Sequence, residues 1–257
     1  MSIQSIHRAA QIMSLFSLNQ PSFGISEISR ALDLHQATVQ GITKTLVQEG
    51  FLRQDPATRK YQLGLKIYEL GSILAGSLEI NQKASSPAHN LAKRIQKLVR
   101  IATLDNRSAL VTLDAYPHAE PFILSHFGFR APLYCTAIGK AFLAFFDQRE
   151  MDFYLRQTEL ISYTSTTITK KDDLLKDLEE TRKRGYSINQ EEYFFSRSAI
   201  GAPIFGQEGK IVASICITGF SYQILLEKIE AVSEEIKRTS EEISRYMGYF
   251  VEDKGIK

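Results

Sequence analysis

The order of hydrophobic patterns in the first 64 residues constrains the fold of this chain most. Apolar side chains recur with helical spacing over about residues 3–18, around Ile28, and again over about residues 36–49. The letters "DLH" leave only a tight connection between the second and third of these stretches, and "DPAT" is typical of a hairpin turn between two short alternating segments. Three helices followed by a hairpin predict a winged helix-turn-helix domain over residues 1–64.

Duplex DNA is the partner that this layout favours, since the third helix can enter a major groove and the hairpin can follow phosphates. The charge pattern agrees weakly. Residues 1–64 carry six lysines and arginines against four acids, whereas the rest of the chain is balanced. The expected DNA contacts, from the third helix and the hairpin, are Gln36, Ala37, Thr38, Gln40, Lys44, Arg53, Thr58, Arg59 and Lys60. The alternative is a protein-binding winged domain in which these residues are simply solvated.

Residues 65–80 form the next predicted element, a linker helix. Ser86 and Pro87 make a suitable N-cap and first residue for a separate helix after it. Gly71, Ala75 and Gly76 would allow the linker to approach another helix closely. We expect this helix to pair with its symmetry mate in a homodimer, because two winged domains can then match a pseudo-palindromic site. Docking on its own chain is the alternative.

Residues 81–257 read as alternating strands joined mostly by hairpin turns, with helices at both ends. This pattern predicts an antiparallel sheet covered by helices, and hence an α+β chain of two domains. The expected strands are residues 99–105, 108–116, 120–128, 186–189, 198–205 and 210–219, with a helix over 171–185 and a long final helix from about residue 224 to 247.

Small and hydroxyl-bearing side chains crowd the stretch "RAPLYCTAIGKAFLAFF", residues 130–146, just where an apolar helix begins. Such a sequence is expected either where two backbones touch or where a molecule other than protein must fit. Thr136 is suited to cap the helix, and free amides in its first turn favour an anion.

Several motifs in the right order give the chain a likeness to a known family. They are "SIHRAAQIM", "ISEISRALDL", "TVQGITKTLVQEGFL", "YQLGLKIYELG", "RAPLYCTAIGKAFLA", "RGYSINQEE" and "IGAPIF" with "EGKIVASICITG". Over roughly residues 4–246 the chain resembles IclR-type bacterial transcription regulators. The resemblance implies a winged helix-turn-helix, a linker helix and a GAF-like effector domain, assembled as a homodimer or a dimer of dimers on palindromic operator DNA. Gly41 and Ser196 depart from the family pattern, which usually has arginine and glycine there.

The resemblance also implies that effectors bind against "CTAIGKA". We expect a small or aromatic carboxylate, a small organic acid held by residues of this turn and of facing strands. These residues are Thr136, Ala137, Ile138, Gly139, Asn189, Glu191, Ala199, Ser214, Cys216 and Thr218. Tyr193 and its neighbours suit either an aromatic effector or a core. The alternatives are that Cys216 and Ala199 pack in the core and that Glu191 is solvated, where its charge would oppose an anion.

An enzyme using Cys135 or Cys216 with His118 or His126 is the rival class, but no local signature supports it. The histidines lack metal-ligand spacing. The sequence contains neither a Walker-type phosphate-binding loop nor the dinucleotide-binding motif G-x-G-x-x-G. We therefore expect no catalytic site, metal or cofactor. With two cysteines, no apolar run of about 20 residues and no signal-peptide pattern, we expect a cytoplasmic protein without membrane contact.

Overall fold

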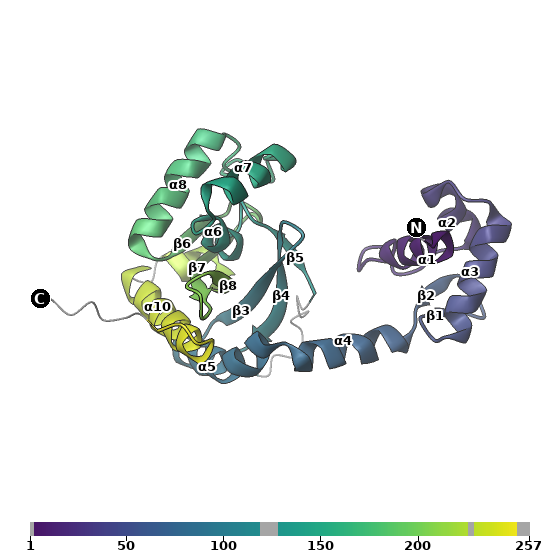
Figure 1. Ribbon diagram of the computed structural model, residues 1–257, viewed down its shortest axis with the longest axis horizontal. Helices are drawn as coiled ribbons and strands as arrows, with labels where there is room; N and C mark the ends of the chain where they lie inside the picture. The colour runs from purple at the N-terminus through teal and green to yellow at the C-terminus, as the bar shows by residue number, and fades with distance from the viewer. Residues whose placement is uncertain (1–2, 119–127, 226–228, 251–257) are drawn as a thin grey trace, which may run out of the picture. The chain divides into compact units, whose positions relative to one another are not determined.

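The computed structural model of the chain describes residues 3–118, 128–225 and 229–250. Contacts divide the chain into two compact units, Met1–Ser77 and Leu78–Lys257. Each unit has its own buried apolar core. The helices and strands of each unit are labelled in Figure 1. Within the described ranges, no helix combines the length and the apolar character that a bilayer crossing needs.

The N-terminal unit is a winged helix-turn-helix followed by a helix. In chain order its elements are α1 (Gln4–Ser14), α2 (Ile25–Leu32), α3 (Gln36–Gln48), β1 (Leu52–Gln54), β2 (Tyr61–Leu63) and α4 (Leu65–Ser77). Asp33 adopts a left-handed conformation that ends α2 and makes the tight turn into α3. The core side chains are Ile12, Phe23, Ile28, Val39, Leu46, Leu52 and Tyr61.

The first helix is shorter than its apolar spacing predicts, because it ends at Ser14 and not near residue 18. Phe16 leaves the helix and packs edge-to-face on Phe23, with ring centroids 5.4 Å apart. In the hairpin, β1 and β2 pair antiparallel, and the Asp55 carboxylate accepts hydrogen bonds from the amides of Ala57 and Thr58. The predicted turn is therefore built by one aspartate side chain.

The described strands of the C-terminal unit form one six-stranded antiparallel sheet, in the order β5-β4-β3-β8-β7-β6. The strands are β3 (Leu98–Asp105), β4 (Ser108–Ala115), β5 (Arg130–Pro132), β6 (Ser187–Gln190), β7 (Arg197–Phe205) and β8 (Ile211–Phe220). The helices are α5 (Glu79–Ile95), α6 (Ala137–Leu143), α7 (Gln148–Gln157), α8 (Lys171–Arg184), α9 (Ser221–Leu225) and α10 (Ile229–Tyr246). The predicted α+β class is confirmed.

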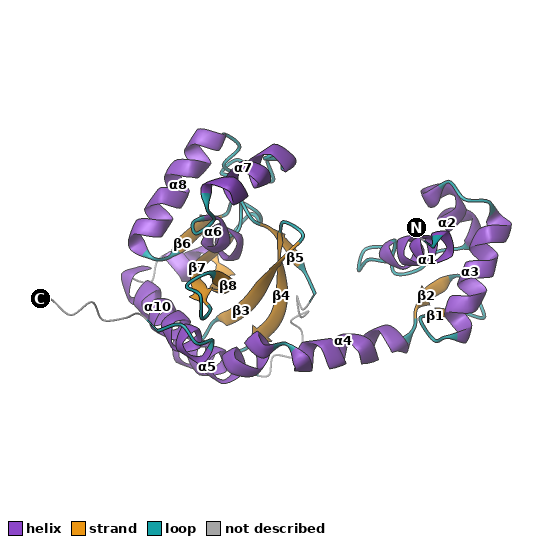
Figure 2. Cartoon of the chain, in the orientation of Figure 1, coloured by secondary structure: helices purple, strands orange, loops and turns teal. Residues whose placement is uncertain are grey.

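The two faces of the sheet are covered by different helices (Figure 2). α5 and α10 pack on one face, where Ile215 and Ile217 of β8 point. α6 packs on the other face, the face of Cys216, with α7 and α8 around it. Alternation along the middle of β8 thus assigns Ala213, Ile215 and Ile217 to one layer and Ser214 and Cys216 to the layer that holds α6.

The prediction that a helix starts at Ser86 is wrong. α5 begins at Glu79 and continues through Pro87, so that the helix expected over residues 65–80 ends at Ser77 and a second one follows almost at once. Proline has no N–H to donate to the carbonyl four residues earlier. Ala84, Ala88 and Leu91 are fully buried against the sheet, and this packing holds the helix together on both sides of the proline. The strand predicted at residues 120–128 lies almost entirely outside the described residues.

Two glycines allow α6 to touch its surroundings backbone to backbone. A Cβ on Gly139 would overlap the backbone of Leu133, and one on Gly201 of β7 would lie 2.6 Å from the carbonyl oxygen of Ala137. Neither contact leaves room for a methyl group. Close backbone approach therefore explains part of the small-residue stretch around residue 139.

We expect Gly139→Ala to lower the free energy of unfolding by about 1–3 kcal/mol or more, because the added methyl must displace backbone. Gly41→Ala is the matched control, since a Cβ there meets nothing within 4 Å in the exposed interior of α3. That variant should instead gain about 1 kcal/mol from helix propensity. Urea unfolding of both variants measures the difference, and a neutral Gly139→Ala would contradict the contact.

Candidate functional site

The exposed face of α3 carries the residues predicted to contact DNA. Val39, Thr43 and Leu46 are buried against the rest of the unit, as expected. The opposite side presents Gln36, Ala37, Gln40 and Lys44 to solvent, with Thr38 half-buried between the two sides. In the hairpin, Arg53, Thr58 and Arg59 are exposed. This arrangement provides a polar helix face and a basic hairpin edge within one unit.

Lys60 differs from the other predicted DNA contacts because it is paired. Its Nζ lies 3.0 Å from Oε1 of Glu27 on α2. The pKa of Glu27 is lowered first by the hydrogen bond from the Gly24 amide and then by Lys60. A phosphate would have to compete with Glu27 for this ammonium group. Lys60 thus fixes the hairpin to α2, whereas Lys44 and Arg59 are more exposed.

A cavity of about 70 Å³ lies where α6 begins, between the sheet and the segment that follows β6. It brings together seven of the residues predicted for effector binding: Thr136, Ala137, Ile138, Asn189, Ala199, Cys216 and Thr218. Its other lining residues are Arg100, Val111, Phe129, Ala131, Tyr193, Phe194, Arg197 and Ser198. At this volume the cavity has room for a few waters and is much smaller than a common ligand site of about 300 Å³ or more.

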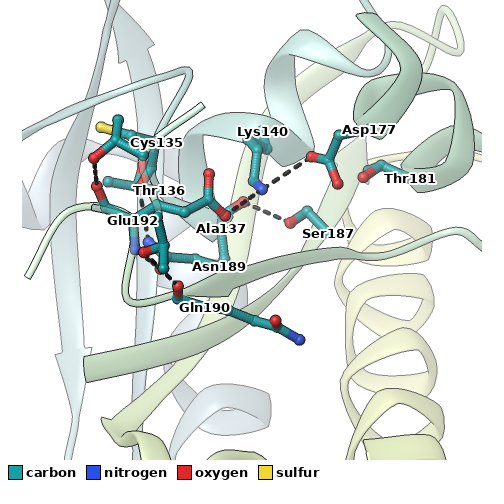
Figure 3. A network of polar contacts seen from close by, with 12 residues as sticks. Cys135, Thr136, Ala137, Lys140, Asp177, Thr181, Ser187, Asn189, Gln190 and Glu192 are labelled. Atoms are coloured by element: carbon teal, nitrogen blue, oxygen red, sulfur yellow. Dashed lines mark hydrogen bonds and ion pairs between the residues drawn. The ribbon is translucent and has the colours of Figure 1, made fainter. Parts of the chain in front are cut away.

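Three side chains from the sheet hold the start of α6 by carbonyl groups, and Figure 3 shows two of them, Ser187 and Asn189. Asn189 Nδ2 donates to the carbonyl of Cys135 at 2.7 Å, and Ser187 Oγ donates to that of Ala137 at 2.6 Å. Ser214 Oγ donates to the carbonyl of Ile138 at 2.8 Å. All three donors are buried, so each bond satisfies a carbonyl that water does not reach. These contacts fix the floor of the cavity.

Gly139, Glu191 and Ser214 do not line this cavity. Gly139 faces the backbone of Leu133, and Ser214 is fully buried beneath the floor. Glu191 lines a separate, more open cavity of about 510 Å³ at α8 and β6. A third cavity, of about 480 Å³, lies between α10 and β7 and contains none of the predicted residues. We therefore place the candidate effector site at the small cavity, where the predicted residues converge.

Positive charge at the cavity comes from two arginines that the sequence patterns did not indicate. Arg100 pairs opposite Cys216 on the neighbouring strand and is bridged to Asp114 at 3.1 Å. Arg197 stacks over the Phe220 ring, with its Cζ 3.9 Å from the centroid. Arg100 reaches the cavity because β3 pairs with β8. These strands are more than a hundred residues apart in the sequence, so their pairing could not be predicted from local patterns.

The amides at the start of α6 are less available than expected. Thr136 Oγ1 accepts a hydrogen bond from the Gly139 amide at 3.1 Å and donates to the Pro132 carbonyl, so it acts as the predicted N-cap. The Lys140 amide bonds to the Thr136 carbonyl. The Gly139 and Lys140 amides are thus occupied within the helix, and an anion at the helix start would have to use the amides of Ala137 and Ile138, which line the cavity.

Both thiols are unsuited to nucleophilic chemistry. Burial raises the pKa of Cys135 to about 12 and that of Cys216 to about 12, so both remain protonated near neutral pH. His118 is exposed and hydrogen-bonded to Gln96, and His126 lies outside the described residues. Within those residues, no group of three His, Cys, Asp or Glu side chains is arranged to hold a metal ion.

Comparisons with known proteins cover both units. Residues 5–56 match the family described as IclR helix-turn-helix domain, and residues 73–245 match the family described as Bacterial transcriptional regulator IclR C-terminal. The transcriptional regulator KipR of Bacillus subtilis is 30% identical over 246 residues, which cover 96% of this chain and 98% of KipR. XynR of Escherichia coli, also named a transcriptional regulator, is 28% identical over 247 residues, with the same coverage of 96% and 98%.

The fold is shared with solved structures as well. The crystal structure of a transcriptional regulator from Alicyclobacillus acidocaldarius aligns with a TM-score of 0.85 at 25% identity. The alignment covers 96% of this chain and 100% of that one. Both units therefore have counterparts in a single known protein.

The burial of the thiols predicts their reactivity. A thiol reagent at pH 8 should label neither Cys135 nor Cys216 in the folded protein, because the thiolate is the reactive form and both groups are buried. Both should react once the chain is unfolded in urea, which provides the control for reagent and stoichiometry. Rapid labelling of either cysteine in the native protein would reopen the enzyme interpretation.

Proposed function

The chain belongs to the IclR family of bacterial transcriptional regulators, and on that premise we propose that a small aromatic carboxylate, bound in the cavity beside α6, sets its affinity for operator DNA. Membership of this family makes the protein a DNA-binding regulator and decides against the enzyme interpretation. The observation that carries the proposal is the combination of aromatic walls and guanidinium groups around one cavity.

The winged domain over residues 1–64 supplies the contacts to DNA. Helix α4 links this domain to the C-terminal unit. Gln40 is suited to pair with an adenine edge in the major groove, and Lys44 reaches a phosphate or a guanine. Gln36, Ala37 and Thr38 approach the DNA at the start of α3, and Arg53, Thr58 and Arg59 approach phosphates from the hairpin. Lys60 can join them only when a phosphate replaces Glu27 as its partner. The exposure of the α3 face and of the hairpin arginines supports this assignment.

The walls of the cavity suit an aromatic ring, and its charge suits a carboxylate. Phe129, Tyr193 and Phe194 offer ring faces and edges. Arg197 has no carboxylate partner among the described residues, whereas Arg100 is already bridged to Asp114. We therefore assign Arg197 as the main anchor of the carboxylate, with Arg100 behind it.

A solved homologue supports the choice of ligand class. The structure of an IclR homologue from Microbacterium hydrocarbonoxydans is complexed with 4-hydroxybenzoate. It shares the fold at a TM-score of 0.80 but only 20% identity, over 95% of this chain and 98% of that one. The ligand therefore guides the choice of compounds to test here, and the recognition of the compound has to come from this chain's own lining residues.

The surface of α4 supports assembly as a homodimer. Within its unit α4 buries none of its residues, and Leu65, Tyr68, Ile73 and Leu74 are all more than half exposed. Several large apolar side chains exposed on a single helix are typical of an interaction site. Pairing of two α4 helices would set the spacing of two winged domains on a palindromic DNA site. A dimer of dimers would contain two such pairs. The effector then acts by binding one arrangement of the pair more tightly than the other.

The role of α3 predicts a change in salt dependence. Lys44→Ala should reduce the slope of log affinity against log salt by about 0.9, because one fewer phosphate counterion is released. Lys183→Ala, on the exposed surface of α8, is the matched control and should leave the slope unchanged. Fluorescence anisotropy with duplexes from around the protein's own gene measures both, and equal slopes would contradict the placement of α3 on DNA.

The effector assignment predicts selective thermal stabilisation. 4-Hydroxybenzoate or benzoate should raise the unfolding midpoint, whereas benzyl alcohol should not, because it lacks the carboxylate. At 100 times its Kd a ligand adds about 2.7 kcal/mol to the free energy of unfolding. Arg197→Gln should abolish the shift, and Arg238→Gln, an exposed arginine on α10, should retain it. Stabilisation of both variants alike would contradict the proposed anchor.

A further inference from the structure

A buried lysine joins the floor of the effector cavity to its wall. Lys140 lies on α6, two residues after the floor residue Ile138, and its side chain is only 1% exposed. Its Nζ lies 2.7 Å from Oε1 of Glu192 and 2.9 Å from Oδ2 of Asp177 on α8 (Figure 3). A charge at this depth remains only because it is paired. The neighbouring elements are therefore bound to α6 through one ammonium group.

Glu192 stands at the base of the wall segment, residues 191–196, which connects β6 to β7. The next two residues, Tyr193 and Phe194, line the cavity. The Glu192 amide donates to Asn189 Oδ1 at 3.0 Å, and Thr167 Oγ1 donates to the Glu192 carbonyl at 2.6 Å. Glu192 is thus the one residue of this segment that is held by its side chain, its amide and its carbonyl.

The wall segment needs such an anchor because its backbone is unfavourable. Glu191 has a φ of 61° and Ser196 a φ of 59°, both in the left-handed region that side-chain-bearing residues rarely adopt. Ser196 is the position where the family pattern has glycine, which adopts this conformation freely. Phe194 and Phe195 are largely exposed. Tyr193 also packs on the ring of Tyr163, with centroids 4.7 Å apart, but Glu192 supplies the buried polar attachment of the segment.

The electrostatics of Lys140 and Glu192 show that each stabilises the charge of the other. Burial raises the pKa of Glu192, and Lys140 opposes that shift. Glu192 Oε2 has no hydrogen-bond partner among the described residues, and within them Lys140 is the cation that pairs with this carboxylate. Asp177 is the more exposed of the two partners, at 26% against 7% for Glu192. Removing Lys140 would leave Glu192 buried without compensation and favour its neutral form.

We propose that the Lys140–Glu192 ion pair is a positioning contact that holds the aromatic wall, Tyr193 and Phe194, over the floor of the cavity and thereby sets effector affinity. The inference rests on the proposed function for its ligand. Because the cavity holds only about 70 Å³, the wall must shift when a ring enters, and Glu192 is the fixed point about which it shifts. Neither residue of the pair needs to touch the ligand.

The test uses the full-length protein with the near-isosteric substitution Glu192→Gln. Amide hydrogen exchange of residues 191–197 should accelerate at least about tenfold, since local opening becomes more frequent. Benzoate affinity should fall about tenfold if the wall is correctly placed only about a tenth of the time, because only that fraction of the protein is ready to bind. Operator affinity without benzoate should not change, which a general loss of structure would not permit.

Asp177→Asn is the matched control, because it removes the other carboxylate of the same lysine without touching the wall segment. It should leave both the exchange rates and the benzoate affinity near those of the wild type. The double variant Lys140→Met with Glu192→Gln should be more stable than Lys140→Met alone, because Glu192 is then not left charged and unpaired and only the more exposed Asp177 loses its partner. Its wall should nevertheless remain as exchange-prone as in Glu192→Gln, which separates positioning from folding.

A reporter independent of any ligand is available, because the chain contains no tryptophan. Phe195→Trp places a single indole in the wall segment, next to the aromatic wall, at a side chain that is 80% exposed. Its fluorescence anisotropy should fall when Glu192→Gln is added, because the segment then moves more freely. The anisotropy should stay unchanged when Asp177→Asn is added instead. Unchanged anisotropy and exchange in Glu192→Gln, or equal effects of the two substitutions, would overturn the inference. Failure of benzoate to bind the wild type would instead count against the proposed ligand, while the anisotropy still decides the positioning.

Discussion

The close contact between the start of α6 and the sheet is the constraint on which the C-terminal unit depends. Gly139 and Gly201 allow backbones to touch, and hydrogen bonds from Ser187, Asn189 and Ser214 satisfy the carbonyls that this contact buries. A helix pressed on a sheet without those donors would leave buried polar groups unpaired. The glycines and the hydroxyl-bearing residues of the two segments are therefore complementary, and together they fix the floor of the cavity.

The same contact determines what the cavity can recognise. The Gly139 amide is capped by Thr136 and the floor carbonyls are occupied, so these backbone groups are not available to a ligand. The proposed recognition therefore rests mainly on side chains above the floor, the aromatic wall and Arg197. Lys140 connects the two parts, since its aliphatic stem lies in α6 and its ammonium group reaches Glu192. Floor and wall are thus coupled through a buried charge.

The local elements were largely predictable because their signals are short-range. The buried face of α3 follows from apolar spacing, and the hairpin follows from its turn residues. Pro87 shows where such rules fail, because burial of Ala84, Ala88 and Leu91 against the sheet outweighs a helix-breaking residue. The site was predictable only in part. Seven predicted residues converge on the cavity, whereas Arg100 and Arg197 came into view only with the strand pairing.

The sequence by itself determined the winged helix-turn-helix, the antiparallel character of the sheet, and the importance of the small-residue stretch at 130–146. Periodicity, turn chemistry and side-chain size are properties of neighbouring residues, and a sequence displays them directly. Only the tertiary structure decided which small residues face the cavity and which face backbone, and that Lys140 is buried beside Glu192. Those outcomes depend on the order and register of strands far apart in the chain, because register alone decides which side chains share a face.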